Sequence, residues 1–179
     1  MKSLARSAGR RRRRSTNCNT RVSRCDIPAR FRFTLPEGWA VKSILHNGRD
    51  VTDATIEMRN GEAMSGLQVI VTDRVTTIAG QVVDDKGAPT TDGTVVVFAD
   101  DAEKWSDGSR YVRAVRPDYQ GQYQVKGLPP GEYLAVALDY VQDGMWNDPE
   151  YLVSIRRYGQ KLAVGEGESR AISLKLIVP

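Results

Sequence analysis

From Phe31 onward, short runs of alternating apolar and polar residues are separated by turn residues, a pattern that predicts strands rather than helices. An early series contains three such runs, which are Phe31 to Phe33, Trp39 to Leu45 and Gly66 to Val71. Asn47-Gly48 follows the second run and favours a tight reversal, because both residues tolerate positive φ angles. The early part of the chain is therefore predicted to be a small β unit.

A second, longer series begins near Val75 and contains seven predicted strands. They are Thr77 to Val83, Thr94 to Phe98, Tyr111 to Val115, Gln122 to Val125, Tyr133 to Leu138, Lys161 to Val164 and Ala171 to Val178. Many short strands with turn residues between them are typical of a sandwich. The fold class is therefore all-β, a β-sandwich of about seven strands preceded by a partial β domain.

One short helix is predicted as an insert in this plan. Asn147 or Asp148 can cap its start. Pro149 suits the first helical position, because an N–H at that position would have no acceptor within the helix and proline therefore loses no hydrogen bond. Gly159 can end it. The spacing of Tyr151, Leu152 and Ile155 places their side chains on one face.

Two stretches of the chain resemble each other. Leu35 to Val41 aligns with Leu128 to Leu134, and Gly61-Glu62 with its following strand aligns with Gly165-Glu166 and its following strand. If the two series are copies of one domain, the first copy keeps only its C-terminal half. We therefore expect a fragment of a longer multi-domain protein, with a partial domain at residues 31–74 and a complete sandwich at residues 75–179.

Charge divides the chain differently. Residues 1–30 carry ten Arg or Lys and one acid, whereas residues 31–179 carry sixteen basic and twenty-one acidic groups. The first thirty residues are predicted to be a disordered basic arm. The basic run has two interpretations. It is an unnatural start of the reading frame, or it is an arm that binds nucleic acid or anionic surfaces. The folded body has no basic stripe, so it is not expected to bind nucleic acid.

Apolar stretches are too short for a transmembrane helix, and no apolar core follows Arg14 as a secretion signal would require. The chain as written thus predicts neither a membrane span nor a signal peptide.

Four segments in a fixed order carry a family resemblance. They are Ile78 to Asp84, Gly87 to Pro89, Val95 to Phe98, and Tyr123 to Val125 leading into Gly127 to Tyr133. In this order they resemble the carboxypeptidase regulatory-like domains of bacteria. The resemblance implies a prealbumin-like (transthyretin-like) Greek-key sandwich, of the kind often strung in tandem in large extracytoplasmic proteins.

The last of these segments predicts a corner between two strands. Its structural residues are Gly127, Leu128, Pro129, Pro130, Gly131 and Tyr133. The two prolines stiffen the connection, Leu128 can anchor it in the core, and Tyr133 can pack its ring while its hydroxyl binds a nearby backbone group.

Residues for catalysis or metal binding are sparse. His46 is the only histidine, so neither a zinc peptidase site nor a Ser-His-Asp triad can be assembled. Cys18 and Cys25 are too few for a metal site, and no carboxylates follow calcium-loop spacing. Collagen-adhesin B-type domains share this architecture and often carry an internal isopeptide bond between a Lys of the first strand and an Asn of the last. Thr77 to Val83 contains no Lys and Ala171 to Val178 no Asn, so such a bond is not expected here. The chain is expected to lack catalytic residues, metals and cofactors and not to be an enzyme.

A structural or protein-interaction module is the predicted function. The alternative is a carbohydrate-binding module, because aromatic side chains can stack on sugar rings. Its candidate platform residues are Trp105, Tyr111 and Trp146, although Trp105 and Trp146 are favoured as covers for the open ends of the sandwich. The expected partner is an unidentified protein or polysaccharide surface.

Overall fold

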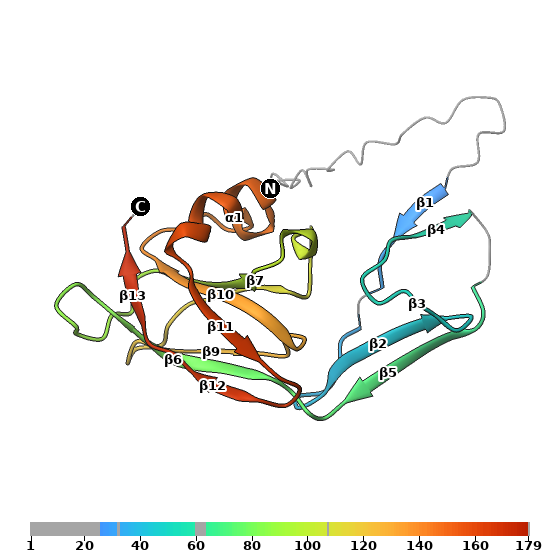
Figure 1. Cartoon of the computed structure of the whole chain (residues 1–179), viewed down its shortest axis with the longest axis horizontal. Helices are drawn as coiled ribbons and strands as arrows, with labels where there is room; N and C mark the ends of the chain where they lie inside the picture. The colour runs from blue at the N-terminus through green and yellow to red at the C-terminus, as the bar shows by residue number, and fades with distance from the viewer. Residues whose placement is uncertain (1–25, 32, 60–63, 107, 179) are drawn as a thin grey trace, which may run out of the picture.

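The computed structural model describes residues 26–31, 33–59, 64–106 and 108–178, which form two β units along the long axis of the molecule (Figure 1). The larger is a β-sandwich. Its strands are β6 (Thr77–Val83), β7 (Thr94–Ala99), β8 (Val112–Val115), β9 (Gln122–Lys126), β10 (Gly131–Leu138), β11 (Gln160–Val164), β12 (Ser169–Ala171) and β13 (Leu174–Ile177). The predicted all-β fold class is confirmed.

Strand pairing explains how the sandwich is layered. On one side β9 pairs with β6, which also pairs with β12 and β13, and on the other β8, β7, β10 and β11 are neighbours in that order. The last strand, β13, joins the layers because its start pairs with β6 and its end with β10.

The apolar core lies between these layers, and a second core lies outside them. Every residue of β7 is buried, because alternate side chains point into the sandwich and toward the helix α1 (Pro149–Ile155). Val95 and Val97 belong to the inner core, whereas Val96 and Phe98 belong to the outer one. Because β7 is covered on both faces, its sequence is a continuous apolar run and does not alternate.

The helical insert follows the predicted capping chemistry. The Asp148 side chain accepts a hydrogen bond from the backbone N–H of Glu150, Pro149 occupies the first turn, and Leu152 and Ile155 are buried against the outer core. The described residues also include the 3₁₀ turns η1 (Ala102–Lys104), η2 (Met145–Asn147) and η3 (Arg156–Tyr158).

The strand predicted at Ala171 to Val178 is two strands, β12 and β13. The chain bends between them, where the Ile172 N–H donates to the Ala79 carbonyl at 2.9 Å and the Tyr123 hydroxyl donates to the Ile172 carbonyl at 2.8 Å. A Cβ on Gly80 would overlap that Ile172 carbonyl. The glycine therefore permits the close backbone approach that splits the strand.

The smaller unit contains β1 (Asp26–Ala29), β2 (Ala40–His46), β3 (Arg49–Asp50), β4 (Ile56–Arg59) and β5 (Leu67–Thr72). A three-stranded sheet has the order β3-β2-β5, and β1 pairs with β4. Asn47 and Gly48 have φ values of 51° and 79°, so the predicted Asn-Gly reversal joins β2 to β3.

Two sequence-based expectations differ from the structure in this unit. Phe31 and Phe33 lie outside any strand, in a loop that faces the sandwich. Residues 26–29, which the charge pattern places in a disordered arm, form β1 because β4 supplies a distant partner strand that local periodicity cannot reveal. The aligned strands pair differently, since β2 and β5 are antiparallel whereas β10 and β13 are parallel. Residues 1–25 of the predicted arm, with Cys18 and Cys25, lie outside the described residues.

Candidate functional site at the junction of the two units

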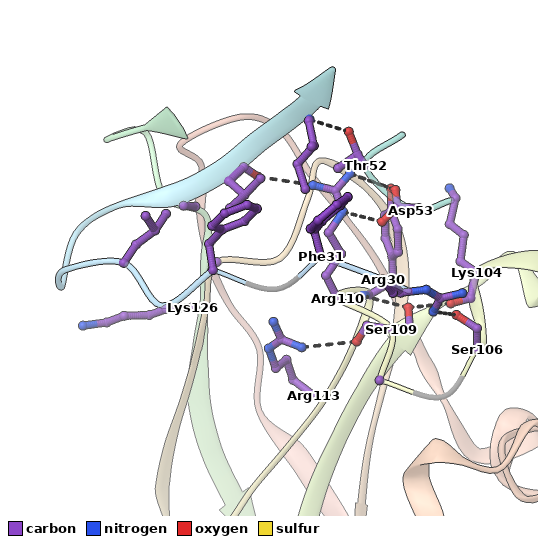
Figure 2. A pocket seen from close by; sticks show the side chains of 18 of the residues that line it. Arg30, Phe31, Thr52, Asp53, Lys104, Ser106, Ser109, Arg110, Arg113 and Lys126 are labelled. Carbon is purple, nitrogen blue, oxygen red and sulfur yellow. Dashed lines mark hydrogen bonds and ion pairs between the residues drawn. The ribbon is translucent and has the colours of Figure 1, made fainter. Parts of the chain in front are cut away.

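A cavity of about 720 Å³ lies between the small unit and the sandwich (Figure 2). One wall comes from the loop that leads into β2, and the other from η1 and the segment that precedes β8. A smaller cavity of about 220 Å³ adjoins it, because both are lined by Ala40, Val41, Arg110, Tyr111 and Gly127. Ligand sites favour such boundaries between units, at volumes of roughly 300–1,000 Å³.

Arg110 is the central contact between the units. Its Nε lies 2.8 Å from Oδ1 of Asp53 and its Nη2 lies 2.9 Å from Oδ2, so the ion pair is bidentate (Figure 2). Nη1 also donates to the backbone carbonyl of Val41 at 3.2 Å. A guanidinium suits this position because it presents several donors in one plane.

Tyr111 completes the contact. Its hydroxyl donates to Oδ2 of Asp53 at 3.0 Å, and the Arg110 guanidinium lies 5.1 Å from the ring centroid. Burial raises the pKa of Tyr111 and keeps the phenol a neutral donor. Burial alone would lower the pKa of Arg110, but the hydrogen bond to Asp53, the negative charge of Asp53 and the contact with Tyr111 together outweigh it, so the net pKa is raised. Asp53 thus accepts from two neighbouring residues of the sandwich.

Further polar contacts cross the junction. Arg30 donates to Oγ of Ser106 at 2.7 Å, and Lys42 Nζ lies 2.8 Å from Oε1 of Glu166. The bond from Lys42 lowers the pKa of Glu166. Both members of the Lys42–Glu166 pair are solvent-exposed, so this contact orients the units more than it stabilises them.

The corner motif holds the connection between the units. Thr76 is the residue immediately before β6. Its hydroxyl donates to the Leu128 carbonyl, and its own carbonyl accepts a hydrogen bond from the Gly127 N–H at 3.0 Å. The Tyr133 hydroxyl donates to the Pro129 carbonyl at 2.6 Å, which is the kind of bond expected from the sequence. Leu128 and Tyr133 are both buried in the inner core.

Pro129 and Pro130 line the smaller cavity, and Gly131 begins β10. The corner thus faces the small unit and forms part of the junction.

The three predicted platform residues do not share a surface. Trp105 is only 5 % exposed, and its indole N–H donates to the Ala99 carbonyl at 2.7 Å. The turn η1 reverses the chain after β7 and so brings the indole back to the end of that strand. Trp146 is partly buried against the outer core, whereas Tyr111 packs against the inner core. Of the three, Tyr111 lines the junction cavity.

Sequence reasoning missed Arg110 and Asp53. They lie 57 residues apart, and neither belongs to a motif whose spacing would pair them. The residues of the described ranges contain no group of three or more His, Cys, Asp or Glu that could hold a metal ion. Nor do these ranges include a helix that is long and apolar enough to cross a membrane.

Comparisons with known proteins reveal neither a matching family model nor a matching curated protein. Solved structures that are similar include a Streptococcal ancillary pilin, at 14 % identity and a TM-score of 0.40 over 68 % of this chain and 38 % of that one. The major pilin subunit of Bacillus cereus matches at 15 % identity and 0.36, over 56 % of this chain and 28 % of that one. A carbohydrate binding protein of Pseudomonas aeruginosa, described as putative, matches at 14 % and 0.36, over 56 % and 87 %. At these scores the likeness concerns the fold alone, and the chain spans less than two fifths of either pilin.

The same comparison corrects the expectation that the chain is not an enzyme. Catechol 1,2-dioxygenases are among the similar structures, for example that of an Acinetobacter species at 12 % identity and a TM-score of 0.32, over 56 % of this chain and 52 % of that one. A sequence without recognisable catalytic motifs therefore does not place the chain outside the enzymes.

Proposed function

We propose that the chain is a structural or protein-interaction module of a larger, multi-domain extracytoplasmic protein, in which the bond between Arg110 and Asp53 fixes the two β units in one relative orientation. The carboxypeptidase regulatory-like resemblance supports the multi-domain and extracytoplasmic parts of this proposal. The bidentate contact supports the fixed orientation.

The geometry favours a rigid rather than a flexible junction for two reasons. Arg110 bonds to a side chain and to the β2 backbone at once, so rotation of one unit breaks several contacts together. The connection between β5 and β6 has four residues, and the last of them, Thr76, is bonded to the corner. A module that keeps such an angle can hold a binding surface at a set distance and direction from its neighbours.

Distances between spin labels test this proposal. The full chain, with Cys18 and Cys25 replaced by Ser, would carry labels at Gln68→Cys in β5 and at Tyr119→Cys on the sandwich, both exposed positions. We expect one narrow distance distribution that broadens on Arg110→Ala. Arg170→Ala is the matched control, because Arg170 pairs with Glu168 within the sandwich. An Arg110→Ala distribution as narrow as that of the control would refute the proposed role of the junction.

The division at residue 75 is part of the proposal and has its own test. Residues 75–179 expressed alone should unfold cooperatively on heating, as the inner and outer cores both lie within that range. Loss of cooperative unfolding in this piece, with retention in the full chain, would make residues 31–74 part of the same domain.

A further inference from the structure

The large junction cavity has aromatic rings on one wall. Phe31 and Phe33 are stacked with centroids 6.4 Å apart, and Trp39 follows in the same loop. Phe33 is 40 % exposed and Trp39 is 49 % exposed. These rings offer apolar faces to a molecule inside the cavity.

A tight turn holds the most exposed of these rings in place. The Trp39 N–H donates to the Pro36 carbonyl at 3.2 Å, and Gly38 has a φ of 86° at the position where a type II turn needs a positive value. The backbone of Trp39 is therefore set before any ligand arrives, which reduces the entropy lost on binding.

The facing wall is polar and carries charges of both signs. The charged residues around the cavity are the cations Arg30, Lys104, Arg110, Arg113 and Lys126 and the anions Asp53, Asp101 and Glu103. Ser109 adds a hydroxyl and lies beside Arg110 and Arg113 (Figure 2). Three of the cations already donate to protein groups, Arg30 to Ser106, Arg110 to Asp53 and Arg113 to the Ser109 carbonyl. A neutral ligand whose groups both donate and accept hydrogen bonds suits such a wall.

Sugar hydroxyls donate and accept, and the C–H face of a pyranose ring stacks on aromatic side chains. We propose that the junction cavity binds a neutral oligosaccharide, with Trp39 and Phe33 beneath its rings and the charged wall around its hydroxyls. Of the set Trp105, Tyr111 and Trp146 expected from the sequence, this site includes Tyr111 but neither tryptophan. It goes beyond the proposed structural role, because a rigid junction needs no ligand.

Titration of the full chain with cellohexaose, chitohexaose, xylohexaose and maltohexaose tests the proposal, with hexagalacturonate as an acidic probe. We expect at least one neutral hexasaccharide to change tryptophan fluorescence and to release or absorb heat in calorimetry. Trp39→Ala and Phe33→Ala should each weaken that binding about tenfold or more. Trp146→Phe, the matched control, should leave it unchanged because Trp146 lies on the outer core.

Three results would overturn the saccharide site. They are no binding of any neutral probe at millimolar concentration, binding that survives both Trp39→Ala and Phe33→Ala, and binding of hexagalacturonate alone. Calorimetry of Phe33→Ala keeps the test valid if Trp39→Ala fails to fold. The spin-label distances of the unliganded chain report on the rigid junction separately, so failure of one proposal leaves the other open to judgement.

Discussion

The carboxylate of Asp53 and the guanidinium of Arg110 form two near-parallel hydrogen bonds of 2.8 and 2.9 Å across the junction of the two β units. The Arg110 side chain is only 25 % exposed. Its positive charge is therefore less well solvated than that of a surface arginine and relies more on the carboxylate of Asp53 for stabilisation. Charge-assisted, bidentate pairs of this kind also specify direction, because both bonds must align at once. The pair therefore sets an orientation as well as an attraction.

Replacing Asp53 with Asn is expected to destabilise the full chain by about 1 kcal/mol. The amide keeps the shape of the carboxylate but cannot accept from both guanidinium nitrogens, and it leaves the Arg110 charge without its counter-ion. The estimate is kept small because the Asp53 side chain is itself 46 % exposed. Urea unfolding followed by circular dichroism measures the change.

Asp85→Asn is the matched control for this substitution, since Asp85 lies in an exposed turn of the sandwich. Equal midpoints for the two variants would show that the bidentate pair adds nothing to stability.

Much of the sandwich could be predicted, because helix capping and strand alternation depend on residues that are close together in the sequence. The helix α1 begins at Pro149, where Asp148 caps it, and β6 occupies the range Thr77–Val83 expected from alternation. The split between β12 and β13 could not be predicted in this way. It depends on the missing Cβ of Gly80, whose effect appears only where the distant Ile172 crosses it.

The junction could not be predicted, because its contacts are long-range. Alternation places Trp39 in a strand, and Trp105 is expected to cover an open end of the sandwich or to serve as a binding platform. In the structure Trp39 precedes the strand and lines a cavity, and Trp105 is buried. Hydrophobicity alone cannot distinguish these two indoles. The deciding contact is the bond from the Trp105 indole to the Ala99 carbonyl, which depends on how η1 turns the chain.

Tyr133→Phe is expected to cost about 1 kcal/mol without changing the fold. The ring stays in the inner core, but the Pro129 carbonyl loses the donor that now lies 2.6 Å away. Thermal unfolding of the full chain measures the loss. Tyr119→Phe is the control, because Tyr119 is 85 % exposed, and a loss of equal size there would contradict the role assigned to the Tyr133 hydroxyl.

Gly80→Ala should be much more damaging, by about 3 kcal/mol or more. The added methyl would overlap the Ile172 carbonyl and press on the Tyr123 ring, and both are held by the bond between them. Gly165→Ala is a suitable control, since the methyl there would meet only the movable carboxylate of Glu168 at 3.3 Å. Similar melting temperatures for the two variants would show that the backbone crossing can relax.

Asp100 links β7 to the end of the helical insert and to β11. Its Oδ2 lies 2.9 Å from Nζ of Lys161, and its Oδ1 lies 2.6 Å from Nη2 of Arg156. The hydrogen bond from Lys161 is the largest influence on the Asp100 carboxyl, and with that from Arg156 it outweighs burial, so the pKa falls below its ordinary value of 3.8. The side chain is 16 % exposed, although both cations reach solvent.

A lowered pKa means that the native state binds the Asp100 proton less tightly than the unfolded chain does. The stabilisation is therefore complete above the ordinary pKa and is lost as pH falls from about 4 through the native pKa. We expect Asp100→Asn to lower the free energy of unfolding by about 1 kcal/mol at pH 7, and the difference from the unmodified chain should shrink below about pH 4.

Urea midpoints of both chains between pH 7 and pH 2 measure this difference. Asp143→Asn, at an exposed pair 3.9 Å from Arg116, should show little difference at any pH. A constant gap for Asp100→Asn across this range would mean that packing, and not the ionised carboxylate, stabilises the link.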